Sequence, residues 1–118
     1  MATTRKLLVR MPASLRDAAV ECVSPFGGSV SALMRVRLAV FQERLDGDVP
    51  TDAPSLAELG LPETDNVVVS SRVDEGLLAS IEARIAPYGG DVKAVVVDEF
   101  ARFVQEERER RAAQAVAS

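Results

Sequence analysis

The chain of 118 residues contains no histidine, no tryptophan and only one cysteine, Cys22. The absence of histidine removes the commonest general base and metal ligand, and it leaves Cys22 without the partner that would activate a nucleophilic thiol. We therefore expect no enzyme activity, no metal site and no cofactor. Cys22 lies on the apolar stripe of an expected helix, where a buried structural thiol is the usual role.

Long apolar runs are also missing, and Arg10 interrupts the short run Leu7-Leu8-Val9 near the N-terminus. We expect neither a membrane span nor a secretion signal, and the single cysteine favours a cytoplasmic location. Apolar residues make up 47% of the chain and charged residues 27%. This balance indicates one compact domain and argues against disorder.

Charge is distributed unevenly along the chain, whose net charge is −4. Residues 1–45 hold seven basic and three acidic residues, residues 46–65 hold six acidic residues and no basic one, and residues 66–118 hold seven basic and nine acidic residues. Only the first segment is suited to face a polyanion, so the chain is not a general nucleic-acid binder. We interpret the carboxylate pairs Asp98-Glu99 and Glu106-Glu107 as solvated helix faces.

The chain does contain an internal duplication. A shift of 62 aligns residues 10–45 with residues 72–107 without a gap, and nine of the 36 positions are identical, where about three would match by chance. We name residues 1–45 the first unit and residues 66–118 the second unit. Each is too short to bury much surface alone, so the two are expected to share one core.

Each unit opens with a β-rich run of strand length, residues 5–11 and 67–73. Side chains alternate between the two faces of a strand. The inward set is predicted to be Leu7, Val9, Met11, Val69, Ser71 and Val73. The outward set is predicted to be Lys6, Leu8, Arg10, Val68, Ser70 and Arg72.

Two helices are expected after each strand. The first has Pro12 in its first turn or Asp74 as its N-cap, and it ends near Ser24 or Ala86, before a Pro-Gly turn. The second begins at the N-cap residues Ser29 and Asp91. The repeat assigns the β-branched run 95–97 to a helix. In the second unit this helix is extended, with i,i+4 ion pairs Glu106–Arg110 and Glu107–Arg111.

Residues 46–65 form an acidic linker with three prolines, at positions 50, 54 and 62. Ser55 and Glu58 have the spacing of a capping box and predict one helical turn before Gly60. The linker is long enough to return the second strand to the side of the first. We expect the two strands to pair in the antiparallel sense, which satisfies the main-chain groups that an isolated strand would leave open.

This order of strand, helix, glycine turn and capped helix resembles the ribbon-helix-helix family of bacterial and phage regulators. The segments Val9-Arg10-Met11-Pro12 and Gly27-Gly28-Ser29-Val30-Ser31 carry the resemblance, which covers residues 4–45 and 66–107. Family members are homodimers whose strands pair into an antiparallel ribbon, and this chain resembles a tandem version with both halves fused. The implied fold is mainly α with a short two-stranded antiparallel β-ribbon, a single-chain pseudo-dimer.

The resemblance also implies a function: a sequence-specific regulator of transcription, such as a repressor, or an accessory factor of the kind found in conjugative relaxosomes. In the family, the ribbon enters the major groove of double-stranded DNA. Carried over to this chain, the base-contacting residues are Lys6, Leu8, Arg10, Val68, Ser70 and Arg72. The implied phosphate contacts are Arg5, Gly28, Ser29, Val30 and Lys93.

The second unit departs from this pattern, because Asp91 stands where the first unit has Ser29, and its charge would repel a phosphate. The apolar residues Leu8 and Val68 on the outward face also suggest a covered surface. The alternative hypothesis is therefore a ribbon-helix-helix scaffold that binds a protein partner, as an antitoxin-like, phage-encoded or adaptor protein, without binding DNA. Whether the second unit contacts DNA, and whether two chains associate along a longer site, stays open.

Overall fold

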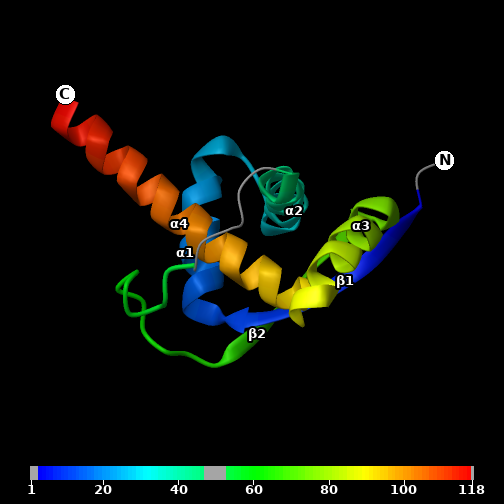
Figure 1. Ribbon diagram of the computed structural model, residues 1–118. Helices are drawn as coiled ribbons and strands as arrows, with labels where there is room; N and C mark the ends of the chain where they lie inside the picture. The colour runs from blue at the N-terminus through cyan, green and yellow to red at the C-terminus, as the bar shows by residue number, and fades with distance from the viewer. Residues whose placement is uncertain (1–2, 47–52, 118) are drawn as a thin grey trace.

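The computed structural model describes residues 3–46 and 53–117, so residues 47–52 of the expected linker, Pro50 among them, lie outside the described residues. Within the described part, the protein is mostly helical, with one two-stranded antiparallel sheet, four α-helices and two short 3-10 helices (Figure 1). In chain order the elements are β1 (Thr4–Pro12), α1 (Ala13–Val23), η1 (Ser24–Phe26), α2 (Val30–Asp46), β2 (Asn66–Asp74), α3 (Glu75–Ile85), η2 (Ala86–Tyr88) and α4 (Val92–Ala117).

The bounds of these elements repeat at the offset found in the sequence. Adding 62 to the bounds of β1, α1 and η1 gives those of β2, α3 and η2, and α2 and α4 begin at equivalent residues. The expected extension of the last helix is present, since α4 has 26 residues and α2 has 17. One expectation was wrong: Pro12 ends β1 and is the N-cap residue of α1, because its ψ of 137° is extended rather than helical.

The two strands pair in the antiparallel sense over their whole length, as predicted, and Leu8 lies opposite Ser70 at the centre of the ribbon. The predicted alternation is also confirmed, because all six residues of the inward set are buried and all six of the outward set are exposed. In Figure 1 the ribbon runs from the bottom of the molecule up its right side, and α1, α2 and α4 lie to its left. One face of the ribbon therefore closes the core, and the side chains of the other face are exposed.

The helices begin and end where the sequence indicates. The carboxylate of Asp74 accepts the Leu77 N–H at 2.9 Å, and the Ser29 hydroxyl accepts the Ala32 N–H at 3.1 Å. After α1 and η1 the chain turns at Gly27, whose φ of +67° is a conformation that residues with a Cβ rarely adopt. The Gly28 N–H then donates to the Val23 carbonyl at 3.3 Å, which ends the helix.

Among the residues whose burial the structure describes, the core is aliphatic with two buried phenylalanines, Phe41 and Phe100. Cys22 is part of it, as predicted, and burial raises the pKa of its thiol. The β-branched run at 95–97 is helical, because in α4 it packs Val96 against the same core.

The linker residues 53–65 pack against the rest of the molecule. The predicted capping box is present, since the Ser55 hydroxyl accepts the Glu58 N–H at 3.1 Å. Leu59 is buried in the core, and the Ser14 hydroxyl of α1 donates to the Pro62 carbonyl at 2.7 Å. This part of the linker holds the start of α1 beside the approach to β2.

The interpretation of Glu99 as solvated was wrong, whereas Glu106 is exposed as interpreted. The side chain of Glu99 is fully buried and lies within 3.0 Å of guanidinium nitrogens of Arg37, Arg44 and Arg102. Glu106 is 48% exposed and pairs with Arg37 and Arg44 of α2. Both carboxylates lie on the side of α4 that faces α2, so arginines of α2 reach them.

The expected pair of Glu107 with Arg111 was also wrong in its spacing. The Glu107 carboxylate is 2.7 Å from a guanidinium nitrogen of Arg110, an i,i+3 pair. A hydrogen bond from Arg110 is the main cause that lowers the pKa of Glu107.

Candidate nucleic-acid interface

The six residues predicted to contact bases form one continuous exposed surface, which we name the outer face: Lys6, Leu8, Arg10, Val68, Ser70 and Arg72. The strand register fixes their arrangement, with Lys6 opposite Arg72, Leu8 opposite Ser70, and Arg10 opposite Val68. Leu8 is 48% exposed and Val68 is 55% exposed, which is unusual for large aliphatic side chains on a sheet. The outer face thus presents cationic, apolar and hydroxyl groups together.

Two cations of the outer face are neighbours across the ribbon. Lys6 and Arg72 are directly opposite across the ribbon, an arrangement of like charges that destabilises a sheet. Asp74, which lies two residues beyond Arg72 on β2, directs its carboxylate to the Leu77 N–H. The arrangement therefore leaves two adjacent positive charges available to an anion from outside the chain.

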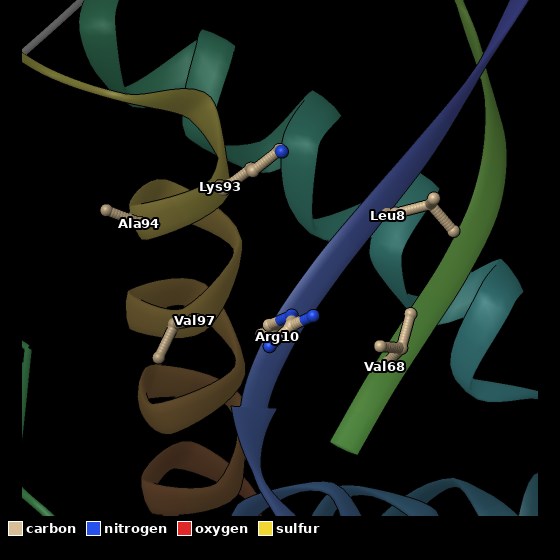
Figure 2. Close-up of a pocket in the computed structure, with 6 residues that line it drawn as sticks. All are labelled: Leu8, Arg10, Val68, Lys93, Ala94 and Val97. Atoms are coloured by element: carbon tan, nitrogen blue, oxygen red, sulfur yellow. The ribbon is translucent and has the colours of Figure 1, made fainter. Parts of the chain in front are cut away.

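An open pocket of about 430 Å³ lies where the outer face meets the start of α4. Its lining residues, shown in Figure 2, are Leu8, Arg10, Val68, Lys93, Ala94 and Val97. In the figure the first turns of α4 run alongside β1, and Leu8 and Val68 lie close together on neighbouring strands. The structure thus brings the predicted phosphate contact Lys93 to the same pocket as Arg10, although the two are 83 positions apart in the sequence.

On the other edge of the ribbon, the start of α2 contacts β2 through a cation that sequence reasoning missed. The guanidinium of Arg35 donates to the hydroxyl of Ser71 at 3.2 Å, and the Ser71 hydroxyl donates to the Ser31 carbonyl at 2.8 Å. Arg35 remains exposed. Arg35 is the equivalent of Val97, which lines the pocket beside β1.

The other predicted phosphate contacts, which do not share one environment, are Arg5, Gly28, Ser29 and Val30. Arg5 forms an ion pair with Glu82 of α3, away from the outer face. The Gly28 N–H is used by the Val23 carbonyl and is not available to a phosphate. Ser29 uses its hydroxyl as the cap of α2, and the N–H groups of Val30 and Ser31, at the first positions of the helix, have no partner within the helix itself.

In the second unit, Asp91 caps α4 by accepting the Lys93 N–H at 3.0 Å. The carboxylate thus takes up one of the amides that a phosphate would use and adds a negative charge beside the rest. The start of α4 offers Lys93 as a cation, whereas the start of α2 offers backbone amides and Arg35.

Comparisons with family models, curated proteins and solved structures find no match to this chain. No helix in residues 3–46 and 53–117 is long and apolar enough to cross a membrane. The same residues contain no group of three or more acidic or cysteine side chains placed to hold a metal ion.

Proposed function

We propose that this chain is a sequence-specific DNA-binding regulator of the ribbon-helix-helix type, a transcriptional repressor or a relaxosome-type accessory factor. The observation that carries the proposal is the exposed outer face, on which Lys6 and Arg72 stand side by side with Arg10 two residues away from the ribbon centre. A sheet that places like charges opposite each other loses stability unless an anion neutralises them. The phosphate backbone and guanine edges of DNA supply that neutralising partner.

The repeat supports the further proposal that the fold is a single-chain pseudo-dimer. Leu8 and Ser70 occupy equivalent positions of the two units and lie opposite each other in the ribbon. A two-fold axis between Leu8 and Ser70 relates the pairs on one side of them to the pairs on the other side. The pair of Lys6 and Arg72 is thus the counterpart of the pair of Val68 and Arg10. This is the symmetry that a homodimer of one strand would have.

The chemistry of the outer face suits the major groove, which admits a two-stranded β-ribbon. Arg10 and Arg72 can each donate two hydrogen bonds to the O6 and N7 atoms of a guanine. Leu8 and Val68, which are apolar and exposed, can contact thymine methyl groups. Ser70 can donate to or accept from a base edge at the centre of the site.

The starts of α2 and α4 flank the ribbon and provide the phosphate contacts. The open N–H groups at Val30 and Ser31 together with the helix dipole hold one phosphate, and Arg35 lies on the same edge. Lys93 provides the contact on the other edge, beside Arg10. Because the two edges differ, the proposed target is an asymmetric DNA sequence.

The test is fluorescence anisotropy with labelled duplexes, for which the target sequence is first selected from a random pool. Arg10→Gln/Arg72→Gln should lower affinity by at least about 25-fold, because each bidentate contact contributes about 1–3 kcal/mol. The matched control is Arg110→Gln/Arg111→Gln, which removes the same charge near the end of α4 that extends away from the ribbon (Figure 1). The control should bind like the unchanged chain.

Salt dependence gives the second readout, because a protein that neutralises phosphates loses log affinity linearly with log salt concentration. Failure to bind any duplex even at low salt would remove the proposal.

A second candidate function is a docking surface for a protein, which the exposure of Leu8 and Val68 favours. The two functions differ in which residues matter most. Leu8→Ser/Val68→Ser should abolish binding to a protein partner, whereas it should weaken DNA binding less than Arg10→Gln/Arg72→Gln does.

A further inference from the structure

The ion pairs between α2 and α4 join residues that the repeat makes equivalent. Arg37 corresponds to Glu99 and Arg44 corresponds to Glu106 at the offset of 62. The Arg37 guanidinium is 3.0 Å from Glu99, and the Arg44 guanidinium is 3.0 Å from Glu106. The cross pairs are as close, with Arg37 to Glu106 at 3.1 Å and Arg44 to Glu99 at 2.8 Å. We name these four residues the charge-paired cluster.

Equivalent residues meet when two related helices pack around a two-fold axis, since each residue near the axis then faces its own counterpart. If two first units paired with each other in this geometry, Arg37 and Arg44 would face a second Arg37 and Arg44. Two second units would bring four glutamates together. Only a first unit with a second unit places opposite charges at these positions.

Burial determines how strongly the difference between opposite and like charges affects the pairing of the units. The side chain of Glu99 is fully buried and that of Arg37 is 8% exposed. Water cannot screen charges at such positions, and a buried charge without a partner strongly destabilises a fold. Like charges placed there would therefore prevent the two helices from packing.

The apolar residues around the cluster do not discriminate between the units. Phe41 has the equivalent Phe103, and Leu38 has the equivalent Phe100, so either unit offers an apolar surface to its partner. The guanidinium of Arg37 lies over the ring of Phe103, 5.8 Å from its centroid. Because Phe41 is the equivalent ring, the surroundings would accept the same charges in the reverse arrangement.

We propose that the charge-paired cluster is the element by which the first unit selects the second unit as its partner and rejects a second copy of itself. The cluster thereby keeps both different strands in every ribbon. It also prevents two chains from exchanging halves into like-with-like pairs. The inference concerns the pairing of the units and holds whether or not the ribbon binds DNA.

The test uses three variants of the full chain. The all-acid chain carries Arg37→Glu/Arg44→Glu, the all-base chain carries Glu99→Arg/Glu106→Arg, and the exchanged chain carries all four substitutions. Arg102 also contacts Glu99, at 2.6 Å. All three variants and the reference chain therefore carry Arg102→Gln, so that a third cation does not favour one arrangement.

Thermal unfolding followed by circular dichroism gives the first result. We expect Tm to fall by more than about 10 °C in the all-acid and all-base chains. The exchanged chain should recover at least half of this loss although it carries every substitution. If the exchanged chain is as unstable as the less stable of the all-acid and all-base chains, the cluster does not select a partner and the proposal is overturned.

Where the all-acid and all-base chains fail to fold alone, mixing the two provides the decisive measurement. The all-acid and all-base chains, refolded together at equal concentration, should form a complex of two chains in which each unit meets an opposite charge. Sedimentation should show this species and circular dichroism should show recovered helix. A mixture that behaves as the sum of its separate components contradicts the proposal.

Discussion

The two units have the same order of strands and helices. They differ in residues at the interface between them and in residues on their exposed surfaces. Their strands, first helices and turns have equivalent bounds. Their buried charges are opposite in sign, and their second helices are capped by Ser29 in one unit and by Asp91 in the other. The comparison teaches that the common positions specify the fold, whereas the differing positions make the halves distinguishable to each other and to a ligand.

The largest effect is expected from Glu99→Gln. This change removes the fully buried carboxylate that contacts both Arg37 and Arg44, and losing one partner of a buried pair costs about 3–5 kcal/mol. Glu106 contacts the same two arginines but is 48% exposed, so Glu106→Gln should cost no more than about 1 kcal/mol. Urea denaturation of both variants measures the difference, and equal losses would show that burial does not separate the two glutamates.

A second large effect should follow from Ile81→Ala in α3. Ile81 and its equivalent Ala19 are both fully buried, so the two units fill the same place with side chains of different size. Ile81→Ala should lower the free energy of unfolding by about 2–5 kcal/mol, because it leaves a cavity.

The reciprocal change, Ala19→Ile, should cost about 1–3 kcal/mol through overpacking. If Ala19→Ile raised stability instead, the first unit would contain space that the close packing of its core does not indicate.

A smaller effect is expected at the helix starts, where the units differ in charge. Asp91→Ser should raise DNA affinity several-fold, because it removes a negative charge from the proposed phosphate site while keeping a cap. Ser29→Asp should lower affinity by a similar factor. Anisotropy at low salt measures both, and identical affinities for the two variants would place the helix starts away from the DNA backbone.

The smallest effect concerns the pair of Glu107 and Arg110, which the first unit lacks because Leu45 is the equivalent of Glu107. The hydrogen bond from Arg110 lowers the pKa of Glu107, so its contribution to stability is present above the usual carboxyl range and is lost as pH falls through the lowered pKa. The Tm difference between the unchanged chain and Glu107→Gln should therefore shrink from pH 7 to pH 3. A difference that stays constant with pH would contradict this.

Local pattern was enough to predict the ribbon, the helix starts and the exposure of the outer face. Alternation along a strand places Leu8 outward whatever the rest of the fold does, and Asp74 can cap a helix from its own position in the chain. The partners of Glu99 could not be predicted this way, because they depend on how α2 crosses α4. On helix periodicity alone, Glu99 beside Asp98 resembles a solvated face.

The signal for the charge-paired cluster was nevertheless present in the aligned units, as opposite charges at two equivalent positions seven residues apart. Arg35 could not be predicted from local pattern, because its place beside β2 follows from the packing of α2 on the ribbon. The use of the Gly28 N–H within its own turn likewise depends on the geometry of the helix end.

The most direct test of the account is an NMR titration of the ¹⁵N-labelled chain with the selected duplex. The account predicts that amide shifts concentrate on residues 6–10 and 68–72 and at the starts of α2 and α4, with smaller changes along the C-terminal turns of α4. Shifts centred on the helices opposite the ribbon, with the strand amides unchanged, would contradict it.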